Sequence, residues 1–272
     1  MVVTYIQGRS GWSRISLKEI WNYRELLFFL SWRDIKVRYK QTALGVAWAI
    51  LQPLLTMAIF SIFFGRLAKV PSDGVPYPVF ALTALAPWTF FANALAQSSN
   101  SVITNSSLVT KVFFPRLIIP MSAALAGIVD LVIALMLLVG ALVVYRVPLT
   151  AGILLLPLVA VMAIAVALGA GFWLSALNVR YRDVRYALPF LVQIWMFLSP
   201  VAYSSSLVPG PWRTLYGLNP MSGVIEGFRH LLLGTQAVAP QHFVLSAVVA
   251  MALLISGAAY FCRTEKSFSD VI

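Results

Sequence analysis

The chain has 272 residues, of which 60% are hydrophobic and only 11% charged, and its mean hydropathy is +0.87. Soluble domains carry about a quarter charged residues, so this composition excludes an ordinary soluble protein and indicates a protein of the lipid bilayer. The formal net charge of +11 would suggest nucleic acid for a soluble protein. Here the Lys and Arg residues are concentrated in a few loops. This distribution indicates that they set the orientation of the protein in the membrane, and we expect no nucleic acid partner.

Residues 1–40 precede the first long apolar run and are expected to form an N-terminal segment outside the bilayer. Within it, residues 17–40 carry apolar side chains at helical spacing with Lys, Arg and Glu between them. This pattern predicts an amphipathic helix on the membrane surface, serving either as a topological anchor or as a docking site for a partner. Its apolar positions are Leu17, Ile20, Trp21, Leu27, Phe28, Trp32, Ile35 and Tyr39.

About six stretches are long and apolar enough to cross a bilayer, which needs about 20 such residues per helix. The sequence therefore predicts an all-α integral membrane protein with a six-span domain at 41–262 and a short tail at 263–272. The expected spans are 41–65, 79–95, 117–145, 147–179, 186–201 and 243–262.

Asp130 lies inside the third expected span and is the clear intramembrane charge. Burying a carboxylate in lipid is costly, which makes Asp130 a functional candidate. The other interpretation is a hydrogen-bonded packing contact between helices, since no other span offers a basic residue at similar depth.

Residues 204–238, between the last two spans, contain Pro209, Pro211 and Pro220 among apolar residues. The segment is too interrupted to cross the bilayer and too apolar for a free loop, so a pair of short re-entrant helices is expected. On one of them Glu226, Arg229 and His230 have the i, i+3, i+4 spacing of a local ion pair.

The distribution of Lys and Arg predicts the orientation. An even number of spans leaves both termini on one side, and the segments on that side hold 15 of the 20 Lys and Arg residues. By the positive-inside rule, both termini are expected in the cytoplasm.

The sequence contains no recognisable motif for catalysis by this chain. None of its six lysines follows a glycine, so there is no phosphate-binding loop, and His230 and His242 have no metal-ligand spacing. Cys262 is the single cysteine, which excludes an intrachain disulfide. We therefore expect no catalytic residue, no metal site and no cofactor bound by this chain, and not an enzyme by itself.

Several motifs, in order over residues 20–262, are similar to those of polysaccharide-export ABC transporter permeases, which move lipid-linked O-antigen, capsule or teichoic acid chains. They are FLSWRDIKVRYKQTALG at 29–45, LQPL at 51–54, KVFFPR at 111–116, LNVRYRDVR at 177–185, SPVAY at 199–203 and LNPM at 218–221, followed by residues 226–229. The resemblance implies a bacterial cytoplasmic (inner) membrane protein that works as a homodimer. Two separate subunits would bind ATP and Mg and hydrolyse the nucleotide, and lipid-linked glycan and membrane lipids would be the other partners.

The resemblance also implies roles for particular residues. The loop at about 105–116 would be the coupling helix that contacts the ATPase, through Leu108, Val109, Lys111, Phe113, Phe114 and Arg116. The 17–40 helix would be the gate helix. Its basic residues and those of the 178–186 loop would contact the partner or lipid phosphates: Arg33, Lys36, Arg38, Lys40, Arg180, Arg182 and Arg185.

Aromatic side chains in or near the spans are either interface belts and lipid-facing packing or flat surfaces for sugar rings. The resemblance places spans one and five along the transport pathway, which singles out Trp48, Trp195 and Tyr203. Alternative functions are an ABC exporter of teichoic acid, capsule, lipid or drug. More remote ones are a membrane-embedded glycan-processing enzyme and a passive channel or scaffold.

Overall fold

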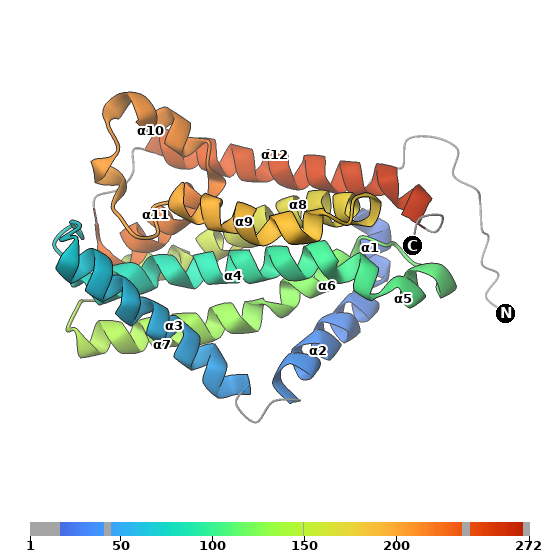
Figure 1. The fold of residues 1–272 in the computed structure, drawn as a ribbon, viewed down its shortest axis with the longest axis horizontal. Helices are drawn as coiled ribbons and strands as arrows, with labels where there is room; N and C mark the ends of the chain where they lie inside the picture. Colours follow the sequence, from blue (N-terminus) through green and yellow to red (C-terminus); the bar gives the residue numbers. More distant parts are fainter. Residues whose placement is uncertain (1–16, 41–44, 149, 236–239, 269–272) are drawn as a thin grey trace.

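The computed structural model describes residues 17–40, 45–148, 150–235 and 240–268. This part of the chain contains helices and no strand. Its long helices form a bundle in which they lie side by side (Figure 1). The α-helices are α1 (Leu17–Asn22), α2 (Arg24–Lys40), α3 (Gly45–Phe60), α4 (Tyr77–Thr104), α5 (Ser106–Lys111), α6 (Ile118–Ala126), α7 (Ile128–Val144), α8 (Leu156–Arg180), α9 (Val184–Phe197), α10 (Gly210–Gly217), α11 (Pro220–Leu233) and α12 (Pro240–Thr264). Short helices of other types are η1 (Ser61–Leu67), η2 (Ala151–Leu155), η3 (Ser205–Leu207) and η4 (Glu265–Ser267).

Five helical stretches among the described residues are long and apolar enough to cross a membrane, and the chain is a multi-pass membrane protein. Each overlaps one of the expected spans; the residues 41–44 at the start of the first lie outside the described part. The five are Ala47–Leu67, Tyr77–Thr104, Ile118–Val144, Ala151–Arg180 and Pro240–Ser267.

The fifth expected span, 186–201, is shorter in the structure than the sequence indicated. Its helix α9 has 14 residues and ends at Phe197. Turns follow up to Val201, because Pro200 disfavours a helical conformation at the residue before it. The apolar residues that continue past Phe197 therefore belong to a turn rather than to a sixth full-length helix.

The core is built around α4, which is uncharged along its whole length and is packed on by α3, α6, α7, α8 and α11. Its side chains Phe80, Phe90 and Phe91 are among the largest that are fully buried. A second cluster near α5 joins α2, α6, α8 and α12, with Phe172 packed on Phe261 and Phe261 on Phe268. The tail thus folds back onto the bundle as far as Phe268.

Helices α8 and α12 cross with their backbones in contact. A Cβ atom added to Gly257 would lie 2.3 Å from the carbonyl oxygen of Gly169, and one added to Gly169 would lie 2.6 Å from the backbone nitrogen of Leu254. Such close crossings of small residues are typical of membrane helices, where packing rather than a hydrophobic driving force holds helices together.

Residues 17–40 do not form the single amphipathic helix that was expected. The helix breaks at Tyr23, and α2 packs on α6 through Leu30 and its neighbours. Apolar side chains on α2 are also exposed, so its apolar residues cover more than one face rather than one stripe. The exposed ones on α1 and α2 are Trp21, Phe28, Phe29, Trp32 and Val37.

Candidate functional site

The segment between α4 and α6 forms a projecting tip at one end of the bundle (Figure 1). It consists of the short helix α5 and an extended stretch that begins at Val112. Phe113 is 81% exposed, and Lys111 and Val112 beside it are exposed as well. An exposed phenylalanine next to a lysine is typical of a surface that contacts another protein.

The predicted coupling residues divide into two groups. Lys111 and Phe113 point outward, whereas Val109 and Phe114 are buried in the cluster with α2, α8 and α12. Leu108 packs against that cluster from a half-buried position. Val109 and Phe114 therefore fix the tip to the bundle and cannot themselves reach a partner.

Two polar contacts tie the tip to the ends of the chain. The guanidinium of Arg33 on α2 donates a hydrogen bond to the side-chain oxygen of Asn105 (2.9 Å), the residue that precedes α5. Arg116, at the other end of the tip, donates to the backbone carbonyl of Glu265 after α12. A movement of the tip would therefore displace α2 and the end of α12.

The predicted basic residues lie at the same end of the bundle only in part. Arg180, Arg182 and Arg185 are exposed at the junction of α8 and α9, and Lys36 and Lys40 are exposed on α2. Arg33 and Arg38 line a hollow of about 470 Å³ between α2 and α4. The three arginines of the α8–α9 junction lie near the tip, whereas α2 runs from this end toward the middle of the bundle (Figure 1), so Arg38 and Lys40 in its last turn lie near the level of Asp130.

Arg38 and Tyr39 at the end of α2 are the partners of Asp130 in α7. Arg38 forms an ion pair with the Asp130 carboxylate, and the Tyr39 hydroxyl donates to its other oxygen. Among the described residues, no other span supplies a cation to Asp130, as expected; the partner comes instead from α2, which the sequence placed outside the spans. Helical spacing placed Tyr39 on the apolar face of α2, but nothing in the sequence marked its contact with Asp130.

The three predicted pathway aromatics do not form one surface. Trp48 is exposed on α3, whereas the Trp195 indole on α9 donates to the side-chain oxygen of Asn219 (2.9 Å) and packs edge-on against Phe91. Tyr203 donates to the carbonyl of Phe197 and accepts from Tyr216, both at 3.1 Å. Trp195 and Tyr203 therefore also hold the turn after α9 in place.

The expected local pair of Glu226 and Arg229 is wrong: among the described residues, no ion pair joins them. Arg229 is 3% exposed and donates to the carbonyls of Val201 and Tyr203, both at 3.0 Å. Its guanidinium carbon lies 3.6 Å from the ring centre of Phe80. Burial lowers the pKa of Arg229 to about 10, so the side chain remains charged while it closes the turn after α9.

Comparison with known proteins connects these features. The model of the family described as "ABC-2 type transporter" matches residues 25–233, which is most of the chain. The chain belongs to the ABC-2 type transporter family. The segment matched in this ABC-2 protein runs from α2 to α11 and so contains the tip, the contact of Arg38 with Asp130, and Arg229.

Individual relatives of this ABC-2 protein match over most of their length. It is 26% identical over 259 residues to the O-antigen export system permease protein RfbA of Myxococcus xanthus, covering 94% of this chain and 98% of that one. An O-antigen export system permease protein RfbA of Klebsiella pneumoniae is 25% identical, with 91% and 95% covered. The polysialic acid transport protein KpsM of Escherichia coli is 24% identical, with 74% and 78% covered.

Proposed function

We propose that this chain is the transmembrane subunit of an ATP-driven exporter that moves a lipid-linked polysaccharide outward across the bacterial cytoplasmic membrane. The observation that carries the cargo is the similarity, over more than nine tenths of each chain, to two permeases named for O-antigen export. The family membership carries the class of transporter.

The end of the bundle that holds α5 faces the cytoplasm in this proposal. Arg180, Arg182 and Arg185 lie there together with Lys111, and the positive-inside rule assigns such an end to the cytoplasmic side. Both termini would then be cytoplasmic, and α10 and α11 would lie at the outer surface.

The exposed tip is the contact for a separate ATP-hydrolysing subunit, which binds ATP and Mg. Two copies of this chain pair with two such subunits, and closure of the ATPases on nucleotide moves the tip as a rigid element. Because Val109 and Phe114 anchor the tip in the second core cluster, its displacement is transmitted to α2, α8 and α12.

Between the two copies, the exposed apolar faces of α3 and α9 border the pathway, and Trp48 offers a flat ring to passing sugars. The basic surface around α2 and the α8–α9 junction attracts the phosphates of the lipid carrier.

The proposal is tested by purifying the tagged chain from mild detergent and assaying what comes with it. We expect a phosphate-loop ATPase in equal amount, with activity that responds to lipid-linked glycan. The double variant Lys111→Ala, Phe113→Ala should lose this ATPase, while Ser107→Ala, at another exposed position of the tip, should retain it. A chain that purifies without any ATPase, or an ATPase that ignores glycan and responds to a lipid or drug, would contradict the proposal.

A further inference from the structure

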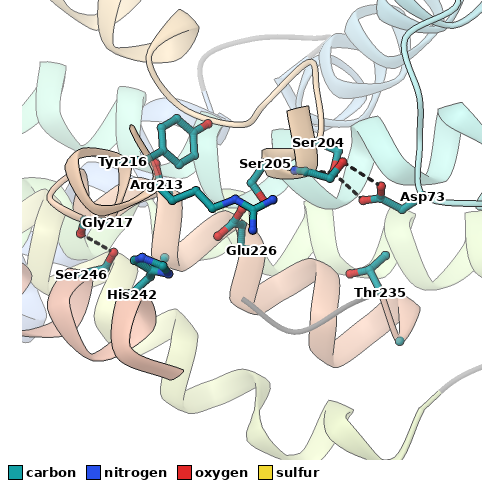
Figure 2. Close-up of a pocket in the computed structure, with 14 residues that line it drawn as sticks. Asp73, Ser204, Ser205, Arg213, Tyr216, Gly217, Glu226, Thr235, His242 and Ser246 are labelled. Carbon is teal, nitrogen blue, oxygen red and sulfur yellow. Dashed lines mark hydrogen bonds between the residues drawn. The ribbon is translucent and has the colours of Figure 1, made fainter. Parts of the chain in front are cut away.

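A polar pocket of about 520 Å³ lies at the α10 end of the bundle, opposite the tip. Side chains from the loop before α4, the turn after α9, α10, α11 and α12 enclose it (Figure 2). Its size falls in the range of small-molecule sites. The polar residues of the lining are Asp73, Ser204, Ser205, Ser206, Arg213, Tyr216, Ser222, Glu226, Thr235, His242 and Ser246.

The chemistry of the lining indicates the kind of ligand. Seven lining residues carry a hydroxyl group, so hydrogen-bond donors and acceptors surround the space, which disfavours an apolar guest. Two acidic residues, Asp73 and Glu226, face the guanidinium of Arg213 in the lining and that of Arg229 behind it, so no excess of positive charge favours an anion. The described residues hold no cluster of three His, Cys, Asp or Glu side chains for a metal ion. A neutral ligand with many hydroxyl groups fits this balance.

The Glu226 carboxyl group is the feature of the lining that indicates a ligand. The residue is 7% exposed, lines the pocket, and its Oε1 atom has no hydrogen-bond partner among the described residues. Burial raises the pKa of Glu226, although the Ser205 hydroxyl and the Arg229 guanidinium oppose this shift. A buried polar atom without a hydrogen-bond partner destabilises the fold. A sugar hydroxyl placed here would donate the missing hydrogen bond.

The other polar groups of the pocket are held in fixed positions. Asp73 accepts hydrogen bonds from Ser204 (2.7 Å) and Ser206 (3.4 Å), and the Arg213 Nε atom donates to the carbonyl of Val208 (3.2 Å). Figure 2 shows Arg213 reaching across the pocket toward Glu226 and Ser205. Groups held in this way lose little entropy when a ligand binds.

We propose that this pocket is a saccharide subsite within each copy of the chain, which binds sugar units through the Glu226 carboxyl group, the Arg213 guanidinium and the serine hydroxyls. This inference rests on the proposed export of a polysaccharide. It adds a place at the α10 end where the emerging glycan is held by one copy alone, away from the pathway between two copies.

The test measures protection of an introduced thiol in the full-length chain reconstituted in lipid nanodiscs. Ser206→Cys places the thiol in the lining, and the unsubstituted protein serves as the blank because Cys262 is buried. The probe is the set of repeating-unit oligosaccharides released by mild acid from the surface polysaccharide of the source cells. At twice its dissociation constant, an oligosaccharide should slow maleimide labelling about threefold, because only the free form reacts.

Matched variants show whether protection comes from the pocket. Adding Glu226→Gln should raise the oligosaccharide concentration needed by about tenfold, because the amide nitrogen that replaces one carboxyl oxygen cannot accept a hydrogen bond from a sugar hydroxyl. Adding Glu25→Gln, the same change on exposed α2, should have no effect, and a thiol at the exposed Ser107 should not be protected. If Ser206→Cys does not fold, Thr235→Cys places a thiol in the same lining.

No protection by these oligosaccharides would overturn the subsite, as would equal protection at Ser107 or protection by inorganic phosphate instead. The outcomes distinguish failure of the subsite from failure of the export proposal. A protected pocket in a chain that purifies without an ATPase would contradict export and leave the subsite in place. An export complex whose pocket is not protected would contradict the subsite alone.

Discussion

Arg38 of α2 forms an ion pair with Asp130 of α7, although 92 positions separate them in the sequence. Both side chains are partly buried, and Asp130 is the thirteenth residue of a 27-residue apolar stretch. The end of α2 is therefore attached near the middle of a span, whereas Arg33, earlier in α2, contacts the segment that begins the tip. This helix joins the surface that would meet a partner to the interior of the bundle.

Removal of one member of this ion pair should be harmful, and removal of both should be less so. Arg38→Met or Asp130→Leu alone leaves a charge without its partner and is expected to cost about 1–3 kcal/mol of unfolding free energy. The double variant should be more stable than the sum of the two losses predicts, measured by thermal unfolding in nanodiscs. Strictly additive losses would show that the two side chains do not interact in the folded protein.

Phe113 and Phe114 are adjacent but should respond in opposite ways to alanine. Phe113→Ala should leave stability within about 0.5 kcal/mol and weaken ATPase binding by about 2 kcal/mol, because the ring is exposed at the tip. Phe114→Ala should cost about 3–5 kcal/mol of stability because it opens a cavity in the second cluster. Thermal unfolding and ATPase co-purification distinguish the two. If Phe113→Ala destabilises the fold as much as Phe114→Ala does, the tip is not arranged as described.

Gly257 should tolerate no side chain. In Gly257→Ala, the new Cβ would collide with the carbonyl oxygen of Gly169, so α8 and α12 must separate, at an expected cost of about 1–3 kcal/mol. Gly140→Ala is the matched control, because a Cβ there meets nothing within 4 Å. Alanine favours a helix over glycine, so the control should be neutral or stabilising by up to about 1 kcal/mol. Equal thermal midpoints for the two variants would contradict the close crossing.

Glu226 should give the protein a characteristic pH dependence. Its pKa is raised above the ordinary value of 4.5, so the folded state holds this proton more tightly than the unfolded state. The contribution of Glu226 to stability is therefore greatest below pH 4.5 and falls as the pH rises through the raised pKa. Thermal midpoints measured between about pH 4 and pH 8 should show this fall in the unsubstituted protein, relative to Glu226→Gln. If stability instead rises relative to Glu226→Gln over this range, the assigned direction is wrong.

The long helices could be predicted from the sequence because hydropathy and length are local properties. The five spanning stretches follow long apolar runs, one of which contains Asp130, and the two short helices α10 and α11 follow the prolines that interrupt residues 204–238. The end of α9 could have been placed better, since Pro200 was visible and argues against a helix through Ser199.

The contacts of the charged residues could not be predicted in the same way. The i, i+3 spacing suggested that Glu226 and Arg229 pair, but Arg229 bonds to two carbonyls of a turn more than 25 residues earlier. Backbone carbonyls carry no sequence signal, and the position of a turn depends on how the helices pack. The coupling segment was identified by resemblance, but which of its residues point outward depended on the second cluster.

The shortness of α9 affects the membrane around it. At 1.5 Å per residue, its 14 residues extend about 21 Å, whereas the hydrocarbon layer is about 30 Å thick. Beyond Phe197 come turn carbonyls, hydroxyl groups and the buried Arg229 cation, none of which mixes with lipid tails. If the proposed polysaccharide moves along this helix, the apolar layer that it crosses there would be shorter by about a third than the full hydrocarbon thickness.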